Sequence, residues 1–166
     1  MRLPYIAKEY INLKTLQQFS ISSNNISKLE GLDNLKALHL FYISSNEISK
    51  LEGLVNLKAL QDFDISSNKI SKFEGLDKQA KNIKTFNISE NPISIEVINQ
   101  ALSTMPNLEE LSLKNLKLTT LPEAVLTLKQ LKTLDLRNFG DDSKNVFSKE
   151  EQEKIKKLLP NCKIEF

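Results

Sequence analysis

The segment ISSNNISKLEGLDN (21–34) occurs three times in the chain with little change. It returns as ISSNEISKLEGLVN (43–56), with 12 of 14 residues identical, and as ISSNKISKFEGLDK (65–78), each copy 22 residues after the one before. Self-similarity at a fixed spacing of this size is typical of solenoids, in which each unit packs only on its neighbours. The sequence therefore predicts a stack of similar turns rather than a globule with one irregular core.

Each unit has the same internal pattern when Leu16, Leu38 and Leu60 are taken as position 1. Apolar residues fall at positions 4 and 6 between polar neighbours, which predicts a short, half-buried strand, and stacked copies of it form a parallel sheet. Asparagine stands at position 9, where its amide can satisfy backbone groups and repeated copies form a ladder. Glycine stands at position 16 (Gly31, Gly53 and Gly75), where the backbone is expected to turn tightly.

The later units vary this pattern. The fourth, which begins at Ile83, is slightly longer, and the fifth changes type, because Pro122 follows Leu121 in the LPxxV form of a 23-residue repeat. A sixth begins with Leu131, Leu134 and Leu136, and Phe139 falls at its position 9.

The tail departs from the repeat. Ser148 with Glu151 three residues on is a capping box, and it predicts an amphipathic helix over 149–159 that Pro160 ends. Counting Leu159 as position 1 places Cys162 and Ile164 at positions 4 and 6 of a seventh strand.

The pattern LxxLxLxxNxIxxLxGLxxLxx resembles the leucine-rich repeat of the short class, with 22 to 23 residues per unit. The tail FSKEEQEKIKKLLPNCKIEF resembles the end of bacterial leucine-rich-repeat proteins, notably spirochaetal ones. The resemblance implies an α/β fold: a right-handed solenoid with a curved parallel β-sheet on the concave face and a short helical or irregular convex side. It also implies a helix-plus-strand cap at the C-terminal end.

We therefore expect a single domain over 1–166, with about six repeats in 16–139 and a C-terminal cap in 140–166. Residues 1–15 form an N-terminal cap or a partial repeat, in which Tyr10 and Leu13 fit positions 17 and 20. If this segment leaves the first strand edge exposed, that edge can pair with a second chain, so a homodimer through the N-terminal edge is an alternative to a monomer.

Composition limits the class of partner. A net charge of +2 is too small for nucleic-acid binding or attraction to an anionic membrane, both of which need a concentrated basic surface. No stretch is long and apolar enough for a membrane span, and the start, MRLPYIAKEY, has no continuous apolar run of signal-peptide length. On sequence alone we expect a cytoplasmic protein, or a secreted or surface protein if a leader has been removed.

Catalytic side chains are scarce. The chain has one histidine and one cysteine: His39 lies in the second repeat, beside its predicted strand, and Cys162 lies in the seventh predicted strand. Five strand spacings separate these strands by about 24 Å, far beyond the reach of a nucleophile and its base. There is no glycine-rich phosphate loop and no CxxC spacing. The sequence predicts no enzyme and no cofactor, with His39 as an exposed polar residue and Cys162 in the core.

Two metal sites are alternatives to a metal-free surface. Asp62 and Asp64 project from one strand beside Asn87, and such oxygens are ligands for calcium. His39 beside Asp62 would give a weak zinc contact. We favour a solvated acidic patch, and hence no metal.

Positions 3, 5 and 7 point out of the concave face. Leu40 and Tyr42 are large side chains that we expect there with acids around them, as in an interface anchor. Acids outnumber bases on this face, so a partner with a basic or aromatic complement is favoured over DNA. The candidate partner-binding residues are Leu40, Tyr42, Asp62, Asp64, Asn87, Glu110, Asp135 and Arg137.

The resemblance implies a protein partner bound through the concave face and, from bacterial members, a host molecule as that partner. The alternative is a structural or self-associating repeat protein without a dedicated ligand, because the first three units are nearly identical.

Overall fold

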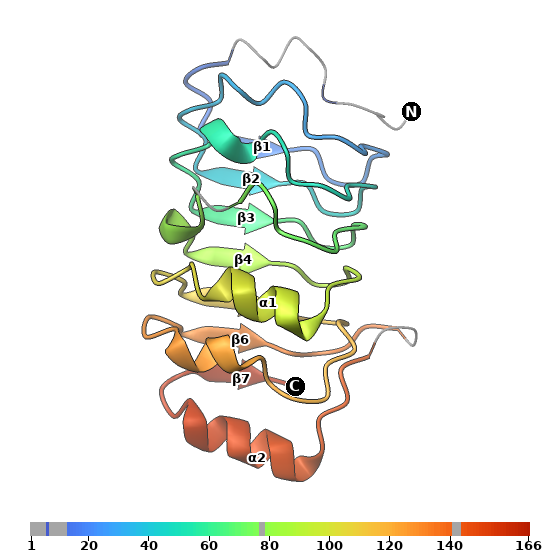
Figure 1. Cartoon of the computed structure of the whole chain (residues 1–166), viewed down its shortest axis with the longest axis vertical. Helices are drawn as coiled ribbons and strands as arrows, with labels where there is room; N and C mark the ends of the chain where they lie inside the picture. The colour runs from blue at the N-terminus through green and yellow to red at the C-terminus, as the bar shows by residue number, and fades with distance from the viewer. Residues whose placement is uncertain (1–5, 7–12, 77–78, 141–143) are drawn as a thin grey trace.

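Parallel strands stacked in chain order form the body of the molecule (Figure 1). The computed structural model describes residues 6, 13–76, 79–140 and 144–166, and within these ranges the sheet has seven strands. They are β1 (Gln18–Ser20), β2 (Leu40–Tyr42), β3 (Asp62–Asp64), β4 (Thr85–Asn87), β5 (Glu110–Ser112), β6 (Thr133–Asp135) and β7 (Lys163–Glu165). Each strand supplies three residues, of which the middle one points into the core and the outer two lie on the solvent side. The predicted alternation at positions 3 to 5 is therefore confirmed.

The position 4 residues of the first four strands form a column of phenylalanines. Phe19, Phe41, Phe63 and Phe86 pair in register, and their ring centroids are 5.9, 5.7 and 6.0 Å apart with the rings stacked. Phe41, Phe63 and Phe86 are completely buried. Phe41 and Phe63 stack on a phenylalanine on both sides, and this matched column supports the register between the first four strands.

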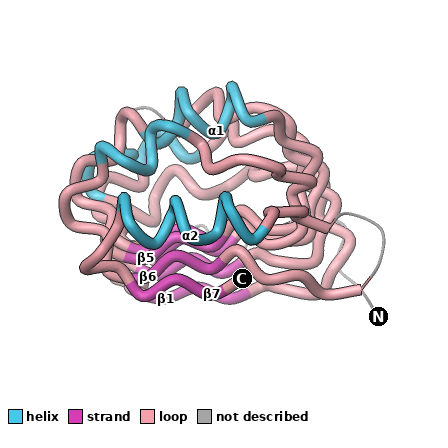
Figure 2. Tube along the Cα trace, turned by 90° about the horizontal axis from the view of Figure 1, so that it is seen from below, coloured by secondary structure: helices cyan, strands magenta, loops and turns pink. Residues whose placement is uncertain are grey.

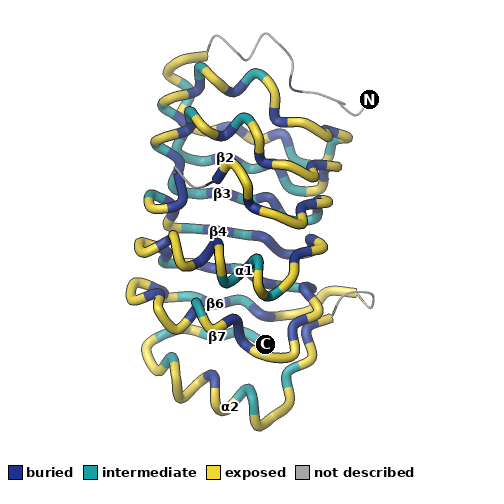
Figure 3. The backbone as a smooth tube through the Cα atoms, in the orientation of Figure 1, coloured by how far each residue is buried: buried dark blue, intermediate teal, exposed yellow. Residues whose placement is uncertain are grey.

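Short helices and turns close each unit on the side opposite the sheet (Figure 2). They are η2 (Leu54–Asn56), η3 (Ala80–Asn82), α1 (Ile95–Leu102), η4 (Glu123–Thr127) and α2 (Lys149–Leu158). Sequence reasoning missed α1, which occupies the extra length of the fourth unit. Its first turn is capped by Ser94, whose side chain accepts a hydrogen bond from the Val97 N–H, and Ile98 and Leu102 on one face are buried. Figure 3 shows that α1 has both buried and exposed parts.

Position 16 requires glycine for a measurable reason. Gly53 has a φ of 102°, and a Cβ added there would lie 1.9 Å from the carbonyl oxygen of Leu29 in the preceding unit. Gly31 and Gly75 also have positive φ. The tight turn predicted at this position is confirmed, and its cause is close contact between successive turns of backbone.

The predicted asparagine ladder is also present. Asn68 donates to the carbonyls of Ile43 and Ile65, both at 3.0 Å, and its Oδ1 accepts the N–H of Ile48 at 3.0 Å. Asn46 and Asn91 make the equivalent set. Each amide thereby joins its own unit to the preceding one and satisfies backbone groups of both units.

In the sixth unit, the prediction that Phe139 falls at position 9 of the repeat is wrong. That ladder position is taken by Asn145, which donates to Leu113 and Leu136 at 2.8 and 3.0 Å, while Phe139 is 53% exposed. The ladder position is thereby displaced by six residues along the chain, from 139 to 145. Asn138 bridges the base of the inserted segment, because its side chain exchanges hydrogen bonds with the backbone of Asn145 at 2.7 and 2.9 Å.

The tail contains the predicted helix and strand, with one correction in register. Helix α2 begins after Ser148, whose hydroxyl accepts the N–H of Glu151 at 3.1 Å. Strand β7 pairs Ile164, not Cys162, with Leu134 at position 4. The turn after the helix uses two residues more than the spacing from Leu159 allows, so the strand begins later. The shift is by an even number, and the same residues therefore face the core.

The predicted N-terminal cap or partial repeat, including Tyr10, lies mostly outside the described residues; of its first twelve residues the structure describes Ile6, which is buried. A dimer through this end consequently stays a prediction. As far as the chain is described, it has no helix long and apolar enough to cross a bilayer.

Candidate functional site

The eight predicted partner-binding residues share the solvent side of the sheet. Alternation in each strand puts them opposite the buried column at position 4. Leu40 and Tyr42 lie in β2, Asp62 and Asp64 in β3, Asn87 in β4, Glu110 in β5, Asp135 in β6, and Arg137 just beyond β6. Neighbouring strands are about 4.8 Å apart, so the set extends over about 19 Å from β2 to β6.

Tyr42, Asp62 and Asp64 form one group, which we call the acidic cluster. Tyr42 pairs with Asp64 across the two strands, and its hydroxyl donates a 2.8 Å hydrogen bond to Oδ2 of Asp62. Partial burial, this hydrogen bond and the two carboxylate charges raise the pKa of Tyr42 to about 12. The phenol therefore stays protonated as a donor and holds one carboxylate in place.

The two aspartates of this cluster have no basic partner among the residues that the structure describes. Burial and the charge of Asp64 raise the pKa of Asp62, against the opposing effect of the bond from Tyr42. Asp64 is oriented by Ser66, whose N–H and hydroxyl donate to Oδ1 at 2.9 and 2.6 Å. Among the described residues, no lysine, arginine or histidine comes within 4.0 Å of either carboxylate. The cluster thus presents uncompensated negative charge beside the apolar side chain of Leu40.

Asp135 and Arg137 belong to a different environment, which we call the ion-pair cluster together with Lys114 and Glu165. Arg137 binds Asp135 through two nitrogens at 3.0 and 2.8 Å and Glu165 at 3.1 Å, and Lys114 lies 3.5 Å from Asp135. Burial alone would raise the pKa of Asp135, but the hydrogen bonds from Arg137 and the two cationic charges lower it. The charges of this cluster neutralise one another, so it is a weaker candidate for charge-driven binding than the sequence suggests.

Charge on the sheet face is therefore uneven. Glu110 is exposed and also has no ion pair among the residues described. Lys163 and Glu165 of β7 pair at 2.5 Å. The net negative charge consequently lies over β3 to β5, with Asn87 between Asp64 and Glu110, while the C-terminal end of the sheet is balanced.

An exposed aromatic ring stands next to the ion-pair cluster. The ring centroid of Phe139 is 5.0 Å from Nζ of Lys114 and 5.8 Å from the guanidinium of Arg137. Its backbone is fixed by Asn115, which exchanges hydrogen bonds with the Phe139 N–H and carbonyl at 2.9 and 2.6 Å. Sequence reasoning missed this ring as a surface feature because it assigned Phe139 to the ladder position.

His39 directly precedes β2, and Cys162 directly precedes β7 at the other end of the sheet. Nδ1 of His39 is 2.7 Å from the carbonyl oxygen of Ala37, so that nitrogen carries the hydrogen. Partial burial raises the pKa of the Cys162 thiol, which keeps it in the less reactive protonated form. In the described part of the chain, no three His, Cys, Asp or Glu side chains are grouped closely enough to hold a metal ion.

Comparison with known proteins identifies the fold. No protein-family model matches the sequence, and no curated protein matches it. Among solved structures, internalin C2 of Listeria monocytogenes is similar with a TM-score of 0.67 and 24% identity, covering 76% of this chain and 54% of that one. A leucine-rich-repeat protein of Leptospira interrogans has a TM-score of 0.66 and 24% identity, covering 99% of this chain and 52% of that one.

A third similar structure is the functional domain of InlJ from Listeria monocytogenes, with a TM-score of 0.60 and 22% identity, covering 78% of this chain and 26% of that one. It includes a cysteine ladder, whereas this chain has a single cysteine and a ladder of asparagines. The chain has the leucine-rich-repeat fold of these bacterial proteins, and it spans about half the length of the first two.

Proposed function

We propose that this leucine-rich-repeat protein is an interaction module, without catalytic activity, that binds a partner protein through the solvent side of its sheet. The acidic cluster is the observation that carries the proposal. Its two carboxylates have no basic partner among the described residues, although the ion-pair cluster shows that this chain can neutralise acids on the same face. Charged side chains that have no partner on a rigid surface support the binding of a second molecule there.

The chemistry of the cluster specifies the partner. Asp62 and Asp64 are two residues apart on one strand and project on the same side, which suits a lysine or arginine placed between them. Leu40 and Tyr42 add apolar and aromatic contact area beside them, a combination that is enriched among residues that dominate binding energy. We therefore propose a partner segment with a basic side chain next to an apolar one.

The similarity to bacterial leucine-rich-repeat proteins extends the set of candidate partners to host proteins, beside proteins of the same cell. It supports a protein partner rather than nucleic acid, whose phosphates the acidic cluster would repel.

The test is capture of partners from host and bacterial extracts with the intact chain, followed by affinity measurement on each purified partner. The double variant Tyr42→Ala with Asp64→Asn removes the ring and one charge, while the asparagine keeps an oxygen for Ser66. We expect affinity to fall by about thirtyfold, which corresponds to one dominant contact of about 2 kcal/mol.

Glu52→Ala is the matched control, since it removes an exposed acid on the other side of the solenoid. It should bind as the wild type does. Partners that bind the double variant and the wild type equally would place the binding surface elsewhere.

Self-association is the second candidate function, and near-identity of the first units favours it. Sedimentation equilibrium separates the two: a concentration-dependent dimer supports self-association through an end of the stack, and a strict monomer removes it.

A further inference from the structure

Two hydrogen bonds join the first unit to the second, and the second to the third, just beyond the strand. Of these two bonds, the third and fourth units share only the one from the Ile70 N–H to Oδ1 of Asn91 at 3.0 Å, because Pro92 has no N–H. Between the second and third units, the N–H of Lys69 donates to the Ile48 carbonyl at 2.8 Å, and the N–H of Ile48 donates to Oδ1 of Asn68 at 3.0 Å. The same pair of bonds joins the first and second units. This double link uses positions 9, 10 and 11, and it closes the side of the solenoid where the strands end.

Both bonds are missing between the fourth and fifth units. Position 9 of the fifth unit is Leu116, whose side chain has no amide group, and Lys117 at position 10 has a left-handed φ of 58°. Within the described residues, the N–H of Lys117 donates no hydrogen bond and the carbonyl of Ile93 accepts none. The N–H of Ile93 bonds instead to Asn91 in its own unit at 2.9 Å.

The regular link returns one step later. Leu118 donates to Oδ1 of Asn145 at 3.0 Å, and its carbonyl accepts the N–H of Val146 at 2.7 Å. The interruption is therefore local: the N–H of Glu90 still donates to the Lys114 carbonyl at 3.0 Å, whereas the backbone at Ile93 and Lys117 shares no hydrogen bond among the described residues.

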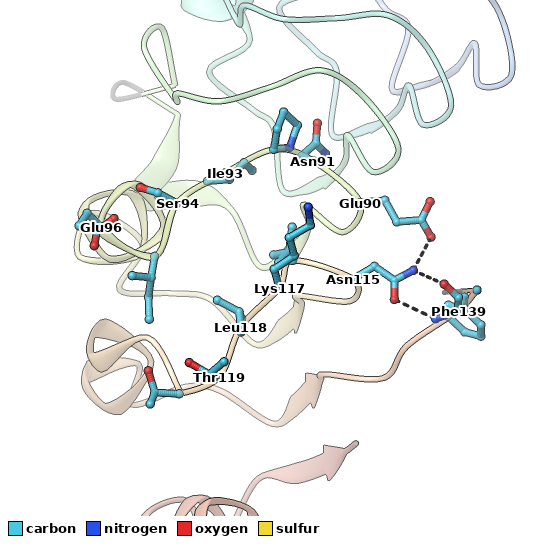
Figure 4. A pocket seen from close by; sticks show the side chains of 15 residues that line it. Glu90, Asn91, Ile93, Ser94, Glu96, Asn115, Lys117, Leu118, Thr119 and Phe139 are labelled. Atoms are coloured by element: carbon cyan, nitrogen blue, oxygen red, sulfur yellow. Dashed lines mark hydrogen bonds between the residues drawn. The ribbon is translucent and has the colours of Figure 1, made fainter. Parts of the chain in front are cut away.

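A groove of about 830 Å³ opens at this interruption (Figure 4). Its two walls are the segments after β4 and β5, and its floor includes the apolar side chains of Ile93, Leu116 and Leu118. In Figure 4, Glu96 lies at one end, Phe139 lies at the other, and Lys117 lies between them. This surface is separate from the solvent side of the sheet, and its use is a binding function beyond the one proposed above.

The backbone groups at the groove indicate what it binds. An unpaired N–H on one wall and an unpaired carbonyl on the other are complementary to a peptide backbone, as in strand addition to a sheet edge. The exposed ring of Phe139, held by Asn115, offers an aromatic contact at one end. The groove volume is in the range of sites that enclose a small ligand or a short peptide segment.

The charged residues at the groove indicate which kind of side chain the bound peptide carries. Lys117 forms no ion pair within the part of the chain that the structure describes, and it is exposed between the walls. The glutamates near it already have partners: Glu90 accepts bonds from Ser67 and Asn115, and Ser94 is bonded to Glu96. These neutral donors do not cancel the charge of either glutamate, so Glu90, Glu96 and Lys117 are all charged. Figure 4 shows Glu96 at one end of the groove and Glu90 near Phe139 at the other, and the ammonium of Lys117 is the charge that lies between its walls.

We propose that the groove between the fourth and fifth units binds an extended peptide segment of a partner protein, with an acidic side chain opposite Lys117. The peptide backbone would take the two hydrogen bonds that the interrupted link leaves open.

The test uses the ¹⁵N-labelled intact chain and two capped peptides, acetyl-Thr-Val-Glu-Val-Thr-amide and its counterpart with lysine in place of glutamate. We expect amide shifts at Ile93, Lys117 and Phe139, and affinity for the glutamate peptide about fivefold above that for the lysine peptide. In Lys117→Glu the preference should reverse. No shifts at these amides, or equal affinity for both peptides in both proteins, would overturn the proposal.

Leu116→Asn is a second variant that repairs the link. The new amide can accept the N–H of Ile93, so we expect slower exchange of that amide and loss of the peptide response. If the variant binds the peptide as the wild type does while Ile93 becomes protected, the interrupted link is not the binding element. Should this variant fail to fold, Phe139→Ala, an exposed change, still tests the groove, and an unchanged affinity there counts against it.

Discussion

Asn68 offers the clearest quantitative test of what holds the units together. Its side chain accepts the N–H of Ile48 and donates to the carbonyls of Ile43, Ile65 and Ser66 at 3.0 to 3.1 Å. In Asn68→Ala, the N–H of Ile48 loses its acceptor while Ile48 itself is completely buried. A buried donor without a partner costs about 1–3 kcal/mol.

The carbonyls lose less than the N–H does. Ile43 also accepts a bond from Asn46, and Ile65 also accepts one from Asn91, so neither becomes fully unpaired. Weakening these shared bonds adds about 1 kcal/mol. The expected loss is therefore about 3 kcal/mol, a large fraction of the 5–15 kcal/mol, roughly, that stabilises an ordinary domain.

Urea unfolding followed by circular dichroism measures the change, with Asn25→Ala as the matched control. Asn25 is exposed and makes a single 3.1 Å bond to Glu47, so its removal should cost under about 0.5 kcal/mol. Hydrogen exchange gives an independent readout, since the Ile48 amide should lose protection in Asn68→Ala and keep it in Asn25→Ala. Equal unfolding free energies for the two variants would refute the reasoning that the ladder joins the units.

Two further predictions concern the turn and the ion-pair cluster. Gly53→Ala places a methyl group 1.9 Å from the Leu29 carbonyl at a φ of 102° and should cost more than about 2 kcal/mol in urea unfolding, whereas Gly140→Ala, with no atom within 4 Å, should cost less. The lowered pKa of Asp135, held down by Arg137 against the effect of burial, means that the ionised carboxylate stabilises the fold above its unfolded pKa. The gap in unfolding free energy between the wild type and Asp135→Asn should be full at neutral pH and shrink as pH falls through that lowered pKa; a gap that widens in acid contradicts this.

The fold could be predicted where one unit repeats another. The strands, the asparagine ladder and the glycine turns each depend on a residue and its equivalent one unit away, so a fixed spacing is enough to identify the contact. Asn68 and Gly53 are examples, because the partner of each lies in the preceding unit.

Prediction failed where the spacing changes. The insertion after Asn138 displaces the ladder position to Asn145, and nothing in a count of residues reveals how many of them leave the stack. Helix α1 did have a signal, namely Ser94 followed by apolar residues at Ile95, Ile98 and Leu102, which is a capped helical period within the longer fourth unit. The turn after α2 shifted β7 for the same reason as the insertion.

The candidate site was predictable in placement but not in charge balance. A period of two puts the eight candidate residues on one face, and the structure places them there. Neutralisation of Asp135 was not visible, because it depends on the side-chain directions of Lys114 and Arg137 and on Glu165 from the displaced seventh strand.

The positions at which the first units differ bear on the choice between binding and self-association. The first and second units are identical at 17 of 22 positions, counting 16–37 against 38–59. Three of the five differences fall at or beside the strand: at position 2, and at positions 3 and 5, where Leu40 and Tyr42 replace Gln18 and Ser20. The residues that pack one unit on the next are therefore the ones that are nearly identical. Their identity does not argue against a specialised binding surface on the solvent side of the sheet.

Another of the differences has a structural explanation within the stack. At position 10 the residues are Asn25, Glu47 and Lys69, and Glu47 bonds to both of the others, at 3.1 and 3.2 Å. At positions 3 and 5 the one comparable contact between units is the bond from Tyr42 to Asp62. Both aspartates of β3 have no basic partner in the described chain. These side chains differ between otherwise equal units, face solvent and make few contacts within their own chain. Contact with another molecule explains them best, so the residues of β2 and β3 are the ones to test first for partner binding.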